Sequence, residues 1–118
     1  MELIRLYTDD GGLARFGTVR LESEPIVSVG VTYPQFMVPS TATRFITFEA
    51  GTVLDWHPAP RWQFVTILGG ACEIELADGS TKRFGPGEIL LVEDTTGQGH
   101  KTHSVGDQPL TLMFSHLE

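Results

Sequence analysis

The chain has 118 residues and a formal charge of −7, because 8 Lys and Arg face 15 Asp and Glu. Its length suits one domain spanning residues 1–118, and its negative charge disfavours nucleic-acid binding because phosphates repel it. No apolar run approaches the ~20 residues that cross a bilayer, and the N-terminus does not resemble a secretory signal, so we expect a cytoplasmic protein without a membrane partner. Cys72 is the single cysteine, which excludes a disulfide framework and a thiolate zinc cluster.

Glycine and proline punctuate the whole chain, with 13 and 7 residues. Short strands fit between such breakers and long helices do not, so the sequence predicts an all-β fold. In the N-terminal part, residues 3–7 and 18–22 are predicted as strands, and Asp9–Gly12 as a turn. Residues 26–33 are β-rich up to a proline, and residues 40–43 are predicted as a loop.

The strand pattern becomes clearer after residue 44. Strands are predicted at 45–48, 52–57, 61–68, 71–76, 81–84, 88–92, 101–105 and 109–114. Asp78-Gly79 is a hairpin dipeptide, because both positions tolerate positive φ. Roughly ten short strands separated by turns are typical of a β-sandwich or barrel.

Alternation along the strands indicates which side chains share a face. One face is predicted to carry Val53, Asp55 and His57, and the next strand's face to carry Gln63, Val65 and Ile67. If both faces turn inward, His57 meets Gln63 inside the fold. His100 and Thr102 are predicted to line a third strand, with His103 pointing the other way.

Three further sites are expected to have structural rather than catalytic or binding roles. Cys72 alternates within a strand and is expected to be a small core residue. Glu93-Asp94, after the strand at 88–92, is expected to be a loop cap to Thr95 and Thr96, because Asp accepts backbone N–H bonds in such turns. His116 lies near the C-terminus and is expected to be structural or frayed.

Several spacings resemble the signatures of the cupin family. The first signature is Gly-x5-His-x-His-x3–4-Glu-x6-Gly, and here Gly51 leads to His57, with Gln63 in the Glu position and Gly70 closing the pattern. The second ends in Gly-x2-His-x3-Asn, matched by Gly97 and His100, with Ser104 where Asn would stand. Its opening glycine is matched by Gly87 within a Gly-Pro-Gly-Glu turn.

The resemblance implies the fold and its extent. It implies a single-domain cupin, an antiparallel jelly-roll barrel (double-stranded β-helix) with a small-molecule pocket at one end. The core motif region is 45–116, and residues 1–44 would add strands to the barrel or to a dimer interface. We expect a homodimer, because exposed sheet edges are usually covered.

The resemblance also implies a metal site, in altered form. Many cupins hold a divalent metal with three His and one Glu, whereas here Ala59 replaces one His and Gln63 replaces the Glu. The implied ligands are therefore His57, Gln63 and His100. Imidazole does not discriminate strongly among iron, nickel, copper, zinc and manganese, and a neutral amide binds each more weakly than a carboxylate.

Three functions remain open. One is a metal-dependent oxygenase, isomerase or lyase that acts on a small organic molecule. The alternative is a metal-free binding or sensing module, with ligand contacts at His57, Gln63, His100, Asp55 and Val65. A third is a metal-free enzyme in which His57 or His100 acts as general acid or base.

Overall fold

The computed structural model describes residues 1–118 and contains strands but no helix. No segment therefore forms a helix of the length and apolarity that crossing a bilayer requires. The strands are β1 (Glu2–Thr8), β2 (Ala14–Arg20), β3 (Glu24–Ser28), β4 (Val31–Gln35), β5 (Ser40–Phe48), β6 (Val53–His57), β7 (Gln63–Gly69), β8 (Ala71–Leu76), β9 (Thr81–Phe84), β10 (Ile89–Glu93), β11 (His100–Val105) and β12 (Leu110–Leu117).

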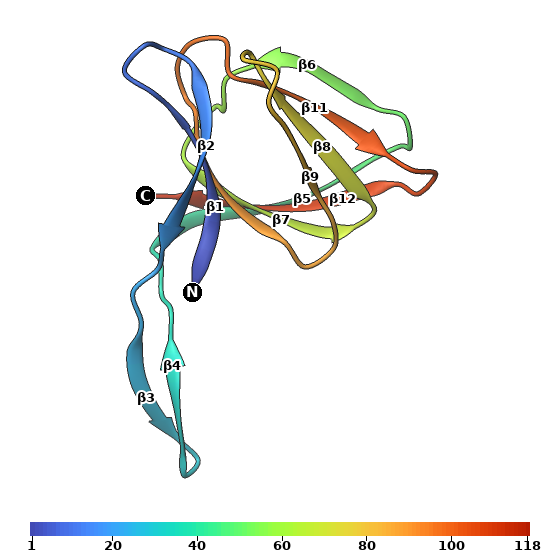
Figure 1. Cartoon of the computed structure of the whole chain (residues 1–118). Coiled ribbons are helices and arrows are strands. Elements are labelled where there is room, and N and C mark those ends of the chain that lie inside the picture. Colours follow the sequence, from blue (N-terminus) through green and yellow to red (C-terminus); the bar gives the residue numbers. More distant parts are fainter.

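Two sheets face each other as the walls of a barrel (Figure 1). The six-stranded sheet has the order β2-β1-β10-β7-β12-β5, and the four-stranded sheet has the order β6-β11-β8-β9. All neighbouring strands pair antiparallel except β1 and β10, which are parallel. The all-β jelly-roll barrel predicted from the sequence is confirmed.

The core lies between the two sheets and follows the strand alternation. In β8, Cys72, Ile74 and Leu76 are buried while the residues between them are more exposed. Leu6 and Leu90 meet them from the six-stranded sheet as part of one buried cluster. Each such aliphatic side chain contributes about 1.5–3 kcal/mol by leaving water.

The predicted Asp78-Gly79 hairpin is present. Gly79 has a φ of 87°, and its N–H donates to the Leu76 carbonyl at 2.9 Å. Strands β8 and β9 pair on either side of this turn. The turn therefore fixes the register that points alternate β8 side chains into the barrel.

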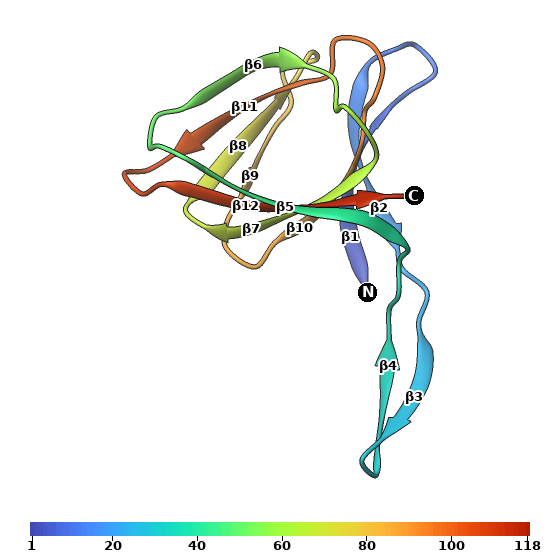
Figure 2. The ribbon, with the colours of Figure 1, turned by 180° about the vertical axis from the view of Figure 1, so that it is seen from behind.

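The N-terminal third departs most from the sequence predictions. Strand β2 begins and ends earlier than 18–22, at Ala14–Arg20. Residues 40–43 form the start of β5 rather than a loop, because they pair with β12. Residues 26–33 are split by a turn at Val29 and Gly30 into the hairpin β3–β4, which projects away from the barrel (Figures 1 and 2).

Candidate functional site

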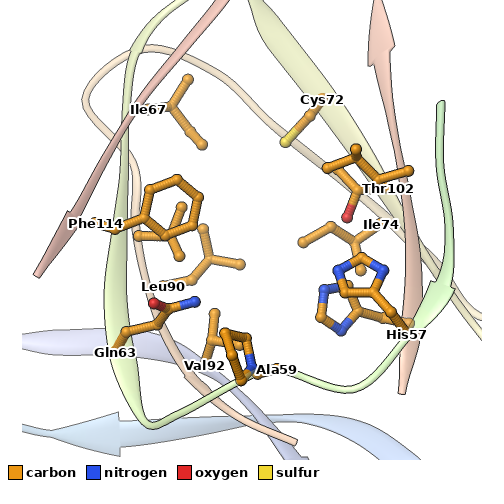
Figure 3. Close-up of a pocket in the computed structure, with 14 residues that line it drawn as sticks. His57, Ala59, Gln63, Ile67, Cys72, Ile74, Leu90, Val92, Thr102 and Phe114 are labelled. Carbon is orange, nitrogen blue, oxygen red and sulfur yellow. The ribbon is translucent and has the colours of Figure 1, made fainter. Parts of the chain in front are cut away.

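A small cavity lies inside the barrel between the two sheets. Its volume is about 80 Å³, and nine of its 14 lining residues are hydrophobic. The lining residues are Leu54, His57, Ala59, Pro60, Gln63, Val65, Ile67, Cys72, Ile74, Leu90, Val92, His100, Thr102 and Phe114. Figure 3 shows two walls: Gln63, Ile67 and Phe114 lie on one side, and His57, Cys72 and Thr102 on the other.

Alternation predicted most of the cavity lining correctly. Gln63, Val65 and Ile67 point inward from β7, as expected. His100 and Thr102 point inward from β11, whereas His103 is absent from the lining. The His103 Nε2 instead lies 3.9 Å from the Glu73 carboxylate.

The predicted face of β6 is wrong, because a bulge interrupts the strand. His57 pairs with His100, but Leu54 pairs with Thr102, so the bulged strand has one residue more than its partner over this interval. The extra residue puts Leu54 and His57 in the cavity and leaves Asp55 outside it. The Asp55 carboxylate accepts the Trp56 N–H at 2.8 Å, so this predicted ligand contact does not reach the cavity.

The rings of His57 and His100 lie side by side. Their centroids are 4.7 Å apart, and their planes are inclined by 53°. The His57 Nδ1 lies 2.6 Å from the Asp55 carbonyl oxygen, and the His100 Nδ1 lies 2.5 Å from Asp94 Oδ2. A carbonyl or an ionised carboxylate only accepts, so each Nδ1 carries a hydrogen, and in the neutral form of each ring Nε2 has the lone pair.

Asp94 is the site residue that sequence analysis missed. Its side chain is 0% exposed, and its backbone oxygen accepts the Ala59 N–H at 2.9 Å. Of the predicted Glu93-Asp94 cap, the Thr95 N–H does donate to Glu93, at its backbone carbonyl, whereas the Asp94 carboxylate bonds His100 rather than a threonine N–H. Asp94 directly follows a largely apolar strand and precedes His100 by six residues. This position in the sequence was the one indication that the Asp94 carboxylate could be buried against the His100 ring.

Gly99 allows the two histidine-bearing segments to approach each other. It has a φ of 73°, and a Cβ built on it would lie 2.0 Å from the His57 carbonyl oxygen. Any other residue would therefore push the end of β6 away from β11. The closeness of the two imidazoles depends on this contact.

The opposite wall carries polar atoms without partners. Figure 3 shows the Gln63 amide nitrogen turned toward the cavity, while Gln63 Oε1 is buried and makes no hydrogen bond. His116 pairs with Gln63 across β12 and β7, is buried rather than frayed, and its Nε2 is also without a partner. Burial, followed by the charges of Arg61 and Arg44, lowers the pKa of His116.

Cys72 lies in the cavity lining, away from acid–base chemistry. Burial, followed by the charge of Glu88, raises the pKa of its thiol to about 11. The thiol is therefore protonated near neutral pH and is neither a nucleophile nor a thiolate ligand. Its role is that of a small core residue, as predicted.

The residues fit part of a metal centre. Two imidazoles with anchored Nδ1 atoms suit metal ligation through Nε2. However, no group of three His, Cys, Asp or Glu residues converges anywhere in the chain, and Gln63 turns its nitrogen to the cavity. His57 and His100 are therefore two suitable ligands without an ionisable third.

Comparison with solved structures supports the fold. The cupin domain of Schizosaccharomyces pombe Cnp3 has a TM-score of 0.56 and 15% identity, covering 98% of this chain and 86% of that one. A Cupin 2 conserved barrel domain protein from Salinispora arenicola has a TM-score of 0.55 and 13% identity, covering 96% and 81%. An oxalate decarboxylase has a TM-score of 0.52 and 23% identity, covering 86% of this chain but 30% of that chain.

These likenesses show a shared fold, and one fold hosts many activities. No protein with a curated description matches the sequence. The family described as "Cupin domain" matches residues 44–116, which is more than half of the chain. Together with the barrel and the His57–His100 pair inside it, this match shows that the chain belongs to the cupin family.

Proposed function

We propose that this cupin binds a small organic molecule in its barrel cavity, without a metal, through His57, His100 and Gln63. The observation that carries the proposal is the fixed pair of imidazoles. One Nδ1–H already donates to the Asp55 backbone carbonyl and the other to the Asp94 carboxylate. Each neutral ring therefore offers an Nε2 lone pair to a ligand. A ligand hydroxyl or N–H group is the natural donor to these two acceptors.

The rest of the cavity supports a particular kind of ligand. A volume of about 80 Å³ corresponds to about three waters at ~30 Å³ each, so the ligand is small. The Gln63 amide nitrogen offers a donor from the opposite wall, and Val65 and Ile67 supply apolar surface. We infer a short hydrocarbon body whose polar end carries both a donor and an acceptor, as in a small hydroxy-carbonyl compound.

The tautomers can be tested without a ligand. Nitrogen-15 NMR of the histidine rings distinguishes Nδ1–H from Nε2–H, and we expect Nδ1–H for both His57 and His100. His103, whose Nδ1 has no such acceptor, is the internal reference. Nε2–H on either cavity histidine would remove the basis of the proposal.

Binding is tested with hydroxyacetone and lactamide as probes. We expect saturable shifts of the Gln63 side-chain amide and of both cavity imidazoles. Thr102→Phe fills the cavity and abolishes these shifts, whereas His103→Phe, on the outer face of the same strand, preserves them. Shifts that survive Thr102→Phe, or no saturable shift with either probe, would count against the cavity as the binding site.

A second candidate is a metal-dependent oxygenase, isomerase or lyase. It is favoured by the acceptor behind each Nδ1, because metal-bound histidines usually have one. His57 and His100 would hold the ion, and Gln63 would add its oxygen after the amide turns over. The ion would supply Lewis-acid polarisation of a ligand oxygen.

Elemental analysis separates the two candidates. The protein is purified without a chelator and without a metal-affinity tag, and we expect no stoichiometric metal. About one iron, nickel, copper, zinc or manganese per chain, lost in His100→Ala, would overturn the metal-free proposal and support the second candidate.

We also infer that the protein works in the cytoplasm as a homodimer, apart from nucleic acids and membranes. The single buried, reduced cysteine suits a reducing compartment. The charge of −7 disfavours phosphate-rich partners. Fractionation of the source cells tests the compartment, and recovery of the protein with membranes or with an exported fraction would contradict it.

A further inference from the structure

The hairpin β3–β4 is an arm that stands apart from the barrel. Its two strands form a sheet of their own and pair with no other strand. In Figures 1 and 2 the arm projects below the barrel, beyond β5, β7 and β12, which form the lower wall. The radius of gyration is 15.4 Å, compared with about 13.5 Å for a compact chain of this length.

The arm has the composition of a buried segment. No charged residue occurs from Pro25 to Thr43, although 19% of the chain is charged. Ile26 pairs with Tyr33 on one face and Pro25 with Pro34 on the other, so both faces are largely apolar. An isolated two-stranded hairpin of this kind is marginally stable in water, so we expect it to be covered.

The tip of the arm adds a second indication. Val29 is 99% exposed and has a φ of 46°, which is an unfavourable conformation for a β-branched residue. Strain of this kind persists where a contact compensates for it. Val29 and Gly30 form the two-residue turn of the hairpin, which requires positive φ at both positions, so the turn itself holds an apolar side chain uncovered at the tip.

The same chain carries an uncovered surface that suits the arm. Leu68 alternates with the cavity-lining residues of β7 and therefore lies on the outer face of the six-stranded sheet, and the exposed Trp62 directly precedes the same strand. Phe45 of β5 joins them through Met113, which pairs with Phe45 and with Thr66. Phe45 is 67% exposed, and Trp62 and Leu68 are exposed as well.

We propose that the β3–β4 arm is a dimerisation arm that packs across the outer face of the six-stranded sheet of a second copy of this chain. Each copy then offers one arm and one receiving face, as a two-fold symmetric interface requires. A five-residue strand is roughly 17 Å long, enough to cross about four strands spaced ~4.8 Å apart. Each side supplies one arm, with five residues in each of its two strands, and one receiving face toward the ~20–30 residues a side of a stable interface.

Charge favours a second copy over a lipid surface. Two copies that each carry −7 repel each other unless their contact is uncharged, and the arm meets that condition. The same net charge opposes approach to an anionic membrane. The dimer also covers both unpartnered apolar surfaces at once, whereas a membrane would cover the arm alone.

The mass of the full chain in solution is measured by light scattering. We expect wild type near twice 13.0 kDa and the double variant Val27→Asp, Val31→Asp near the monomer mass. Phe45→Asp on the receiving face should also dissociate the dimer. Val53→Asp is the matched control, because Val53 and Val31 are both 56% exposed and Val53 lies on the four-stranded sheet; it should remain dimeric.

The variants are checked for folding by the NMR signals of the cavity imidazoles, which should be unchanged. A monomeric wild type would overturn the proposal, as would a dimer that survives both the arm and the Phe45→Asp substitutions. Co-sedimentation of a monomeric wild type with phosphatidylcholine vesicles would assign the arm to lipid instead. Loss of dimerisation with intact probe binding, or the reverse, separates this proposal from the cavity function.

Discussion

The two walls of the cavity are built in opposite ways. On the four-stranded side, His57 and His100 each have Nδ1 held by an acceptor, the Asp55 carbonyl and the Asp94 carboxylate. On the six-stranded side, Gln63 and His116 are adjacent and buried, and each has a polar atom without a partner. The ring orientation of one wall is set before a ligand arrives, although the buried Asp94 Oδ1 behind His100 also has no partner, and the other wall carries unmet hydrogen-bonding capacity at Gln63 and His116.

This difference suggests a division of roles. The histidine wall, which carries His57 and His100, has fixed tautomers and therefore requires a ligand that donates hydrogen bonds to it. The Gln63 wall is the opposite side, on the six-stranded sheet. An unpartnered buried polar atom costs about 1–3 kcal/mol, and a ligand or water that bonds it recovers part of this cost. We infer that the histidine wall orients the ligand and that the Gln63 wall contributes affinity through the amide nitrogen that faces the cavity. Gln63 Oε1 gains a ligand partner only if the amide turns over, and His116 is not among the cavity-lining residues.

The largest expected effect comes from moving the end of β6, which carries His57, away from the start of β11, which carries His100. Gly99→Ala places a Cβ about 2.0 Å from the His57 carbonyl oxygen, so we expect a stability loss of at least about 3 kcal/mol. Gly79→Ala is the control, because its φ of 87° is similar but nothing lies within 4 Å, and it should cost only about 1 kcal/mol. Urea unfolding measures both, and equal losses would contradict the role of the close approach.

The next effect comes from removing the carboxylate behind His100. Asp94→Ala leaves the buried Nδ1–H unpaired, so we expect a loss of about 1–3 kcal/mol and a switch of His100 to Nε2–H. Asp94→Asn keeps a carbonyl acceptor and should retain the Nδ1–H tautomer with a smaller loss. Urea unfolding and ring nitrogen-15 shifts report these two effects, and an unchanged tautomer in Asp94→Ala would show that the wall is fixed by something else.

Sequence reasoning predicted the wall that follows simple alternation. Gln63, Val65 and Ile67 lie inward because β7 is regular over those residues. The same reasoning failed at β6, because a bulge changes the phase between Leu54 and His57 and no residue type announces it. A one-residue shift of this kind reverses which side chains face the core.

Two other features depended on distant contacts. Asp94 resembles a loop cap locally, and only the fold brings its carboxylate onto the His100 ring. Gly99 resembles any turn glycine until the end of β6 is placed against it. The arm was missed for a related reason: residues 26–33 have the β-branched composition of one strand, and a valine stands at the position where the chain reverses.

A smaller effect tests the Gln63 wall by giving it a charge. Gln63→Glu adds an ionisable oxygen ligand opposite the two imidazoles, so affinity for zinc or nickel should rise at least about tenfold, which is about 1.4 kcal/mol. Gln63→Met, similar in size but without an oxygen, is the control and should not gain affinity. Calorimetric titration measures the change, and equal metal affinity in Gln63→Glu and wild type would show that the two walls do not converge on one centre.

The smallest effect is the pH dependence that His116 adds on the same wall. Burial and the nearby arginines lower its pKa below the ordinary 6.5, so between these values the unfolded chain binds a proton that the native chain does not. Stability should therefore fall as the pH drops below 6.5, and His116→Gln should reduce this slope. Urea midpoints at about pH 7.5 and about pH 5.5 give the comparison. If His116→Gln kept the full slope, His116 would not be the group that binds this proton, and its burial beside Gln63 would not govern the response of the protein to acid.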